Sequence, residues 1–200
     1  MVSAKIYIEG GGDSNESFET LFRRSWKKFF ESAGLRGHMP QVVRGGPRKR
    51  TFDLFTTAIA TPDSERVPLL LVDSEGPVQA GRSVWKHLQA RDEWNQPGGA
   101  SEDQAFLMVQ LMETWFLADR DALKRHFGNQ FKETDLKQWP QLEDVPKETV
   151  LDALRKATTK CPSPYAKGKV SFKLLEKINP TLVEAACPHA KALLDRLRTL

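Results

Sequence analysis

Four acidic side chains lie at or inside apolar segments in a pattern that suits metal chemistry. Glu9 follows an apolar run and precedes three glycines, Asp73 and Glu75 follow the run 67–72, and Glu113 is a lone acid within the apolar segment 111–117. In an extended segment, residues i and i+2 point to the same side, so Asp73 and Glu75 can present two carboxylates to one cation. Oxygen ligands with no histidine or cysteine beside them suit Mg²⁺ or Mn²⁺. We therefore expect all four acids to be metal ligands.

Each acid also has a simpler interpretation. Glu9 can be a strand-end acid that faces water, Asp73 can cap a turn, and Glu113 can lie on the solvent-exposed edge of a helix. Asp13 and Asp119 precede helical segments and are expected to be helix caps rather than ligands. Burying a carboxylate without a cation or hydrogen bonds is costly, so Glu113 needs such partners if it is buried.

Strand and helix patterns alternate along the first half of the chain. Strand patterns occupy 5–9, 41–43, 67–72 and the start of 105–118, and apolar residues recur at helical spacing over 18–33 and over Phe52, Phe55 and Ile59. This alternation predicts an α/β fold of the Rossmann-like kind, with an open, mainly parallel sheet of about four strands flanked by helices. Ligands of such sheets bind beyond the carboxyl ends of the strands, where Glu9 and Asp73 are expected.

The rest of the chain is predicted to be mostly helical. The segment 77–99 is expected to be a long loop with a short helix, and 105–118 is expected to change from strand to helix near Glu113. After a polar, proline-containing stretch, helices are expected at 151–158, 172–178 and 188–198. We therefore predict a metal-binding domain over 1–130 and a helical extension over 131–200 packed on it.

Basic residues are unevenly distributed. The net charge of the 200-residue chain is only +4, but from Lys147 onward eleven Lys/Arg stand against five Asp/Glu. A second basic run lies in an expected Gly-Pro loop. Such clusters can bind phosphates, although a solvated surface also explains them. The candidate phosphate-binding residues are Arg44, Arg48, Arg50, Arg82, Lys86, Lys167 and Lys169.

The two cysteines, Cys161 and Cys187, are far apart and predict reduced thiols. The sequence has neither an apolar stretch of about 18 residues nor a signal-peptide pattern. We therefore expect a cytoplasmic protein that does not bind a membrane.

Two acidic segments resemble the Toprim signature of topoisomerases, bacterial primases and OLD-type nucleases. They are Ile6-Tyr-Ile-Glu9-Gly-Gly-Gly-Asp13 and Leu70-Leu-Val-Asp73-Ser-Glu75. The chain is still more similar to a small Toprim-like family of unknown function that is often encoded beside ABC-type ATPases in bacteria. The segments that carry this closer resemblance are Leu71-Val-Asp-Ser-Glu75, Met112-Glu-Thr-Trp-Phe-Leu-Ala-Asp119 and Lys167-Gly-Lys169.

The resemblance implies a compact Toprim-like sheet and a nuclease site. Glu9 would act as general acid/base or metal ligand, Asp73 and Glu75 would hold Mg²⁺, and Glu113 would hold a second ion. A partner ATPase and a role in defence against phage rest on the same resemblance. One residue departs from the pattern, because the second motif is usually Asp-x-Asp and its second acid here is Glu75.

Three functions remain open from the sequence. A Mg²⁺- or Mn²⁺-dependent nuclease acting on DNA or RNA fits the acids and bases best. The alternative is a non-catalytic module that binds nucleic acid or a partner, with Trp85, Trp94 and Trp139 near its loops. A small-molecule phosphotransferase or phosphatase is weaker, since no nucleophile or nucleotide loop is recognisable. The scattered histidines and the absence of a Gly-x-Ser-x-Gly elbow offer no rival catalytic group.

Overall fold

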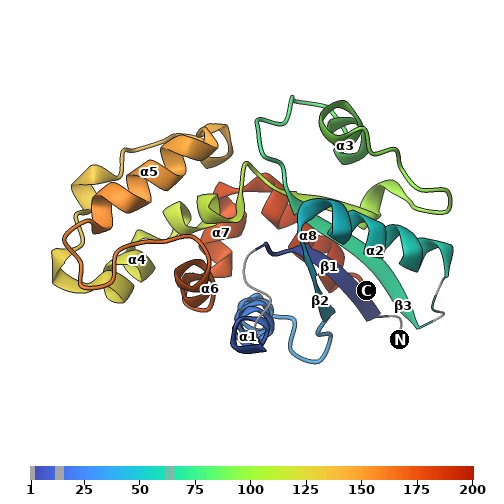
Figure 1. Ribbon diagram of the computed structural model, residues 1–200, viewed down its shortest axis with the longest axis horizontal. Coiled ribbons are helices and arrows are strands. Elements are labelled where there is room, and N and C mark those ends of the chain that lie inside the picture. Colours follow the sequence, from blue (N-terminus) through green and yellow to red (C-terminus); the bar gives the residue numbers. More distant parts are fainter. Residues whose placement is uncertain (1–2, 12–15, 62, 64) are drawn as a thin grey trace.

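Figure 1 shows the fold in a computed structural model, which describes residues 3–11, 16–61, 63 and 65–200. Four strands form one sheet: β1 (Ser3–Glu9), β2 (Gln41–Gly46), β3 (Arg66–Asp73) and β4 (Ala105–Met108). Their order is β2-β1-β3-β4, and all three neighbouring pairs are parallel. The predicted α/β class with an open parallel sheet is therefore confirmed, and the arrangement is consistent with a Rossmann/Toprim-like fold.

Helices cover both faces of the sheet because side chains of the central strands alternate between two apolar layers. On β3, Leu69 and Leu71 belong to one hydrophobic cluster, and Leu70 and Val72 to the other. The first cluster includes α1 (Glu16–Ser32) and the C-terminal helices, whereas the second includes residues of α2 (Arg48–Ala60) and α3 (Val84–Asp92). In Figure 1, α2 lies in front of the sheet and α8 behind it.

The helix predicted over 18–33 is α1, and its apolar face is buried as expected. Phe22, Trp26 and Phe30 are fully enclosed. The helix ends at Ser32, and Gly34 just after it takes a left-handed conformation with φ 87°. The N–H of Leu35 donates to the carbonyl of Phe30 at 3.1 Å. Asp13 and Ser14, which can cap this helix by sequence, lie outside the described residues.

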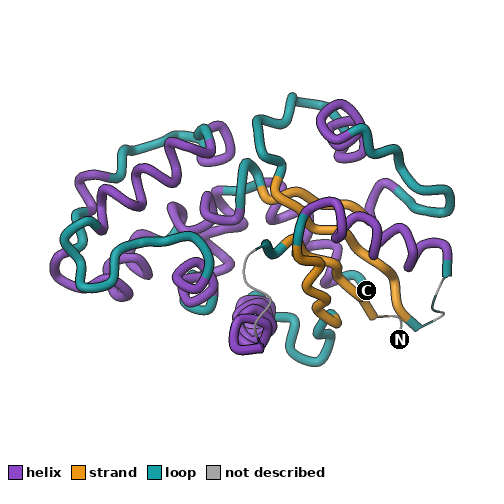
Figure 2. Tube along the Cα trace, viewed as in Figure 1, coloured by secondary structure: helices purple, strands orange, loops and turns teal. Residues whose placement is uncertain are grey.

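The remaining helices follow β4, and Figure 2 shows how they form the mainly helical part of the molecule. They are α4 (Arg120–Phe127), α5 (Lys147–Thr158), α6 (Lys169–Leu175), α7 (Pro180–Ala186) and α8 (Pro188–Arg198). Short 3₁₀ helices connect them: η1 (Glu102–Gln104), η2 (Met112–Ala118), η3 (Gly128–Gln130), η4 (Glu133–Asp135) and η5 (Leu142–Asp144). One apolar core extends from the sheet into these helices, so the division proposed at residue 130 stays a prediction.

Three sequence predictions need correction. The second strand continues to Gly46 instead of ending at residue 43, and Arg48 and Arg50 belong to α2 instead of a loop. A Cβ on Gly45 would lie 2.1 Å from Thr51 Oγ1, so this glycine allows close packing against the helix and does not mark a turn. The third correction is α7, which begins at an unrecognised signal: Asn179 caps the helix by accepting from the N–H of Thr181, and Pro180 follows.

Within the described residues, no helix is both long and apolar enough to cross a membrane. Cys161 and Cys187 are both free and buried.

Candidate metal centre

The strand order places a crevice between the ends of β1 and β3. The chain passes from β1 to β2 on one side and then returns to β3 on the other, so the direction of winding changes between these two strands. Such a switch point opens a crevice at the carboxyl ends of the strands. Glu9 is the last residue of β1 and Asp73 is the last residue of β3, so both acids lie at this crevice.

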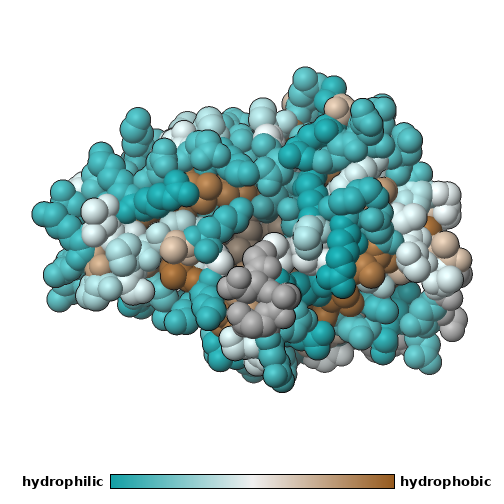
Figure 3. Space-filling view, viewed as in Figure 1, coloured by the Kyte–Doolittle hydropathy of each residue, from teal (hydrophilic) through white to brown (hydrophobic). Residues whose placement is uncertain are grey.

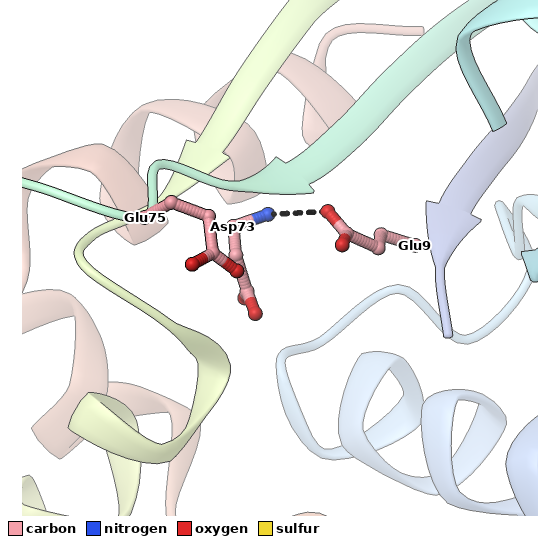
Figure 4. A group of neighbouring side chains, drawn as sticks. All are labelled: Glu9, Asp73 and Glu75. Atoms are coloured by element: carbon pink, nitrogen blue, oxygen red, sulfur yellow. Dashed lines mark hydrogen bonds between the residues drawn. The ribbon is translucent and has the colours of Figure 1, made fainter. Parts of the chain in front are cut away.

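Glu9, Asp73 and Glu75 come together there. Each contributes a carboxylate oxygen, and these oxygens lie within 4.8 Å of one another. Figure 4 shows Glu9 reaching from β1 toward β3, with the carboxylates of Asp73 and Glu75 directed to a common side. The main-chain N–H of Asp73 donates to Glu9 Oε2 at 3.2 Å. The three acids are thus close enough to share one ligand.

Glu75 reaches this position through a turn, because the chain is no longer extended after Asp73. Its φ is 61°, in the left-handed region, where a side chain is uncommon. The N–H of Ser74 donates to the carbonyl of Met108 at 2.9 Å, and the N–H of Glu75 donates to that of Gln110 at 2.8 Å. The chain at the end of β4 and just after it therefore holds the turn. An extended segment was expected from the sequence to bring Asp73 and Glu75 together, and this expectation was wrong, because the turn brings them together instead.

Arg48 links the acids from the first turn of α2. Its guanidinium donates to Glu9 Oε2 at 3.0 Å and to the carbonyl of Asp73, and it forms two hydrogen bonds of 2.7 and 3.0 Å with Asp92. Its guanidinium carbon also lies 5.0 Å from the ring centre of Trp94. Burial raises the pKa of Glu9 above its usual value, although Arg48 opposes that shift.

Asp73 is the most enclosed member of the three. Its Oδ1 accepts from the N–H of Met112 at 2.9 Å, and its Oδ2 lies 3.8 Å from Lys167 Nζ. Burial, the nearby Glu113 carboxylate and Glu9 raise the pKa of Asp73 well above its usual value, and Lys167 opposes them. One oxygen of Asp73 therefore accepts from the first residue of η2, while the other oxygen faces the ammonium group of Lys167.

Glu75 is paired with Lys147, the first residue of α5. Burial alone would raise the pKa of Glu75, but the hydrogen bond and charge of Lys147 lower it below the usual value. Each of the three acids thus has a basic neighbour: Arg48 for Glu9, Lys167 for Asp73 and Lys147 for Glu75.

Glu113 lies in the same pocket but outside the three-residue group. Its side chain is fully buried, which excludes the solvent-exposed position on a helix that was considered for Glu113 from the sequence. Its Oε1 accepts from Tyr165 Oη and Ser171 Oγ, each at 2.9 Å. Its Oε2 is buried and has no hydrogen-bond partner within the described parts of the chain. An unpartnered carboxylate oxygen at such a depth is costly unless something binds it.

A pocket of about 330 Å³ joins these groups. Its apolar wall includes Met108, Met112 and Phe172, and its charged residues are Glu9, Asp73, Glu113 and Lys167. A larger groove of about 470 Å³ lies elsewhere, beside Trp139. In that groove Glu143 and His189 form a hydrogen bond of 2.6 Å, and Arg120 donates to the main-chain carbonyls of Leu136 and Lys137. The chemistry is therefore concentrated in the smaller pocket.

The donor set fits a divalent cation that prefers oxygen. Opposite ligands of an octahedral Mg²⁺ lie about 4.2 Å apart and adjacent ligands about 3.0 Å apart, so oxygens within 4.8 Å of one another need to close by roughly 1.8 Å at most. Glu9 and Glu75 are only partly buried, and rotations of their side chains can supply that change. A cation would also offset the repulsion that raises the pKa of Asp73. The residues present thus fit a metal ion.

The basic residues predicted to bind phosphates lie in three different environments. Arg48 and Lys167 lie beside the acids, as described above. Arg44 is largely buried and donates to the carbonyl of Gly10 at 2.9 Å, with Glu19 at 3.3 Å. Arg50 is exposed and donates to the carbonyl of Gly45 at 3.2 Å. The exposed residues Arg82, Lys86 and Lys169 lie respectively before α3, within α3 and at the start of α6.

Sequence reasoning missed Lys147, Tyr165, Ser171 and Asp92 as parts of the site. Tyr165 and Ser171 flank the Lys167-Gly-Lys169 segment, which was the one available signal for them. Lys147 lies in the basic C-terminal part of the chain but has no motif around it. Asp119 is the cap predicted for α4, since its carboxylate accepts from the N–H of Ala122 at 2.9 Å.

The family model described as a domain of unknown function, DUF4276, matches residues 8–198. This chain belongs to the DUF4276 family. The DUF4276 match includes every acid of the pocket and continues through the helices that carry Lys147, Tyr165 and Lys167. The helical extension is therefore part of the DUF4276 unit, as is the sheet. No match was found among curated proteins, and none among solved structures.

Proposed function

We propose that this protein is a Mg²⁺- or Mn²⁺-dependent nuclease that hydrolyses phosphodiester bonds of DNA or RNA. The observation that carries this proposal is the convergence of Glu9, Asp73 and Glu75 within 4.8 Å at the switch point of the sheet. Hard oxygen ligands at such a site favour these two ions, and a bound ion supplies Lewis-acid activation of a phosphate and of a water.

The side chains have distinct roles in the proposed reaction. Glu9, Asp73 and Glu75 would hold the ion, and the free Oε2 of Glu113 would serve a second one deeper in the pocket. Glu9 is partly exposed, and burial raises its pKa above the usual value, which is the direction that favours a role as general acid/base. Lys167, whose side chain is half exposed, would neutralise a substrate phosphate at the pocket.

Tyr165 and Ser171 support the role proposed for Glu113. They hold one of its oxygens through two hydrogen bonds, so its second oxygen stays directed away from them. A carboxylate fixed in this way is oriented before any ligand arrives. The C-terminal extension, which contributes both residues and Lys167, is therefore expected to be required for activity.

Three parts of the proposal extend beyond the site itself. The relation to Toprim nucleases rests on the two acidic segments and on a fold consistent with that class. A neighbouring ABC-type ATPase as partner and a role in defence against phage rest on resemblance alone. A cytoplasmic location suits the two free, buried cysteines.

A non-catalytic binding module is the second candidate, and one observation favours it. Arg48, Lys147 and Lys167 already pair with the three acids, so the cluster is partly neutralised without a metal. The tryptophans do not strengthen this alternative. Trp85 and Trp94 are buried and Trp139 is partly buried, so at least two of them serve local packing.

A cleavage assay with a matched variant tests the proposal. Labelled duplex DNA, single-stranded DNA and RNA are incubated with Mn²⁺ or Mg²⁺ and wild type, Glu9→Gln or the exposed control Glu133→Gln. Metal-dependent cutting that Glu9→Gln abolishes and Glu133→Gln retains supports the nuclease. Calorimetry with Mn²⁺ is run in parallel, and failure of wild type both to bind the ion and to cut any substrate would favour the binding module.

A further inference from the structure

Five basic side chains lie in two rows along the neighbouring helices α1 and α6. Arg24 and Lys28 lie one turn apart on α1, and Lys169, Lys173 and Lys177 lie one turn apart on α6 and the turn after it. Residues four apart on a helix share a face, so each row points in one direction. All five residues are exposed. We call these five residues the basic ridge.

The two rows adjoin because α1 and α6 pack directly against each other. The ring of Phe172 lies 5.4 Å from that of Phe18 and 5.1 Å from that of Phe22. Glu176, just after α6, accepts from Arg24 at 2.7 Å and lies 3.5 Å from Lys28. Glu176 therefore holds the α1 bases against the C-terminal end of α6.

The ridge carries more positive charge than its neighbours neutralise. Glu176 is shared by Arg24 and Lys28. Over the described residues, Lys169, Lys173 and Lys177 form no ion pair. Lys177 instead contacts His126 Nδ1 at 2.9 Å, and burial together with Lys177 and Lys173 lowers the pKa of that histidine. Among the residues that the structure describes, the α6 row thus has no acidic ion-pair partner.

The ridge begins next to residues that line the metal-site pocket. Gly168, Ser171 and Phe172 line the pocket, whereas Lys169, which lies between them in the sequence, is exposed and outside the lining. From Lys169 to Lys177, a helical rise of 1.5 Å per residue spans about 12 Å. Phosphates of one duplex strand advance by about 3.4 Å, so the α6 row matches roughly three to four of them.

The ridge lacks the apolar anchors that a protein partner would use. Within the described chain, Leu182 on α7 is the one large hydrophobic side chain classed as exposed. Figure 3 shows hydrophilic residues over most of the visible face, with small and separate hydrophobic patches. Protein interfaces depend on buried aromatic and aliphatic anchors, whereas phosphate backbones are bound mainly by charge. The chemistry therefore favours nucleic acid.

We infer that the basic ridge binds the phosphate backbone of a nucleic-acid strand and directs it into the pocket of the metal centre. This inference rests on the proposed function and names the route by which its substrate arrives. Neither α1 nor the row from Lys173 to Lys177 was among the phosphate-binding residues expected from the sequence.

The test measures binding separately from cleavage. Fluorescence anisotropy with labelled single-stranded and duplex DNA and RNA is recorded in EDTA at 50 to 200 mM KCl. Wild type is compared with a Lys169→Gln, Lys173→Gln, Lys177→Gln variant and with a control carrying Lys132→Gln, Lys137→Gln and Lys191→Gln, three exposed lysines on other parts of the fold. Circular dichroism checks that all three proteins remain folded.

The expected result follows from counterion release. Losing three phosphate contacts should reduce the salt slope by about two to three, so wild-type affinity falls roughly 20- to 40-fold more than that of the ridge variant over this range. The control should keep the wild-type slope. Equal slopes for the ridge variant and the control would overturn the inference. So would binding to anionic vesicles or polyglutamate with no binding to nucleic acid.

Calorimetry with Mn²⁺ separates this inference from the proposed function. If wild type binds Mn²⁺ but no nucleic acid, the metal centre is supported and the inference about the basic ridge is wrong. If wild type binds nucleic acid through the ridge but does not bind Mn²⁺ and does not cut, the nuclease proposal is wrong and the inference about the ridge is supported.

Discussion

The main-chain N–H of Asp73 donates to Glu9 Oε2 across 3.2 Å, which links the ends of two neighbouring parallel strands directly. Parallel strands bring their carboxyl ends to the same edge of a sheet, so this link exists only because β1 and β3 are adjacent. The hydrogen bond holds the Glu9 carboxylate beside that of Asp73, where both can face one cation.

Replacing Glu9 by glutamine should remove metal-dependent function and preserve the fold. Glutamine keeps the size and can still accept from the N–H of Asp73, but it lacks the charge that binds a cation. We expect cleavage to fall by at least about 100-fold, the lower range for loss of a catalytic acid or base. The assay is cleavage with Mn²⁺, with circular dichroism to verify folding. Undiminished cutting would show that Glu9 is outside the site.

Replacing Asp73 by asparagine should stabilise the metal-free protein and abolish metal binding. Because burial, Glu113 and Glu9 raise the pKa of Asp73, its ionised form opposes folding, at about 1.4 kcal/mol per pKa unit. Asparagine can still accept from the N–H of Met112. Urea denaturation in EDTA measures the change, and titration with Mn²⁺ should then stabilise wild type alone. A less stable variant in EDTA would contradict this account.

The pH dependence of stability should change when metal is added. Raised folded-state pKa values mean that Asp73 and Glu9 contribute stability at low pH that is lost as the pH rises above their usual values of 3.8 and 4.5. Glu75, with a lowered pKa, contributes in the opposite direction. We expect Asp73→Asn to flatten the decline between acid and neutral pH in EDTA. Saturating Mn²⁺ should do the same for wild type, as measured by denaturation at a series of pH values.

Tyr165→Phe should show whether Glu113 depends on its two hydroxyl partners. The variant removes one hydrogen bond to a buried carboxylate and should cost about 1–3 kcal/mol of unfolding free energy. The protein has one other tyrosine, Tyr7, so Tyr7→Phe is a natural control. Combining Tyr165→Phe with Ser171→Ala should deviate from additivity by about 0.5–3 kcal/mol, because both residues bind the same oxygen. Strict additivity would argue against a shared role.

Lys167→Gln should separate metal binding from catalysis. Removing its ammonium, 3.8 Å from Asp73 Oδ2, should tighten Mn²⁺ binding by up to about fivefold, since a half-exposed pair is worth at most about 1 kcal/mol. Cleavage should nevertheless fall, because the phosphate loses a positive partner. Calorimetry and cleavage at saturating Mn²⁺ make the comparison. Weaker metal binding in the variant would mean that Lys167 supports the acids and does not compete with the ion.

Arg48→Met should be the most destabilising of these changes. It leaves the mostly buried carboxylate of Asp92 with Arg91 as its remaining basic partner and removes the basic partner of Glu9, which should cost up to about 3–5 kcal/mol, the range for breaking a buried pair. The exposed neighbour Arg50→Met is the control and should stay within about 0.5 kcal/mol of wild type. Thermal or urea unfolding provides the measurement.

The sequence alone determined the α/β class, the positions of all four strands, with the ends of β1 and β3 to within two residues, and the acids that lie at strand ends. These features follow from local periodicity, since a strand buried on both faces reads as a short apolar run and an amphipathic helix repeats every 3.6 residues. Glu9, Asp73 and Glu75 were therefore recognisable before any fold was known, and so was Asp119 as a helix cap.

Only the tertiary structure decided what surrounds those acids. The order β2-β1-β3-β4 makes the ends of β1 and β3 a crevice, and no local pattern specifies which strands become neighbours. Lys147 reaches Glu75 across 72 residues of sequence, and Tyr165 reaches Glu113 across 52. Such pairings depend on how the C-terminal helices pack on the shared apolar core, which periodicity does not encode. The sequence thus specified the acids, and the packing of distant segments specified their electrostatic surroundings, their burial and their partners.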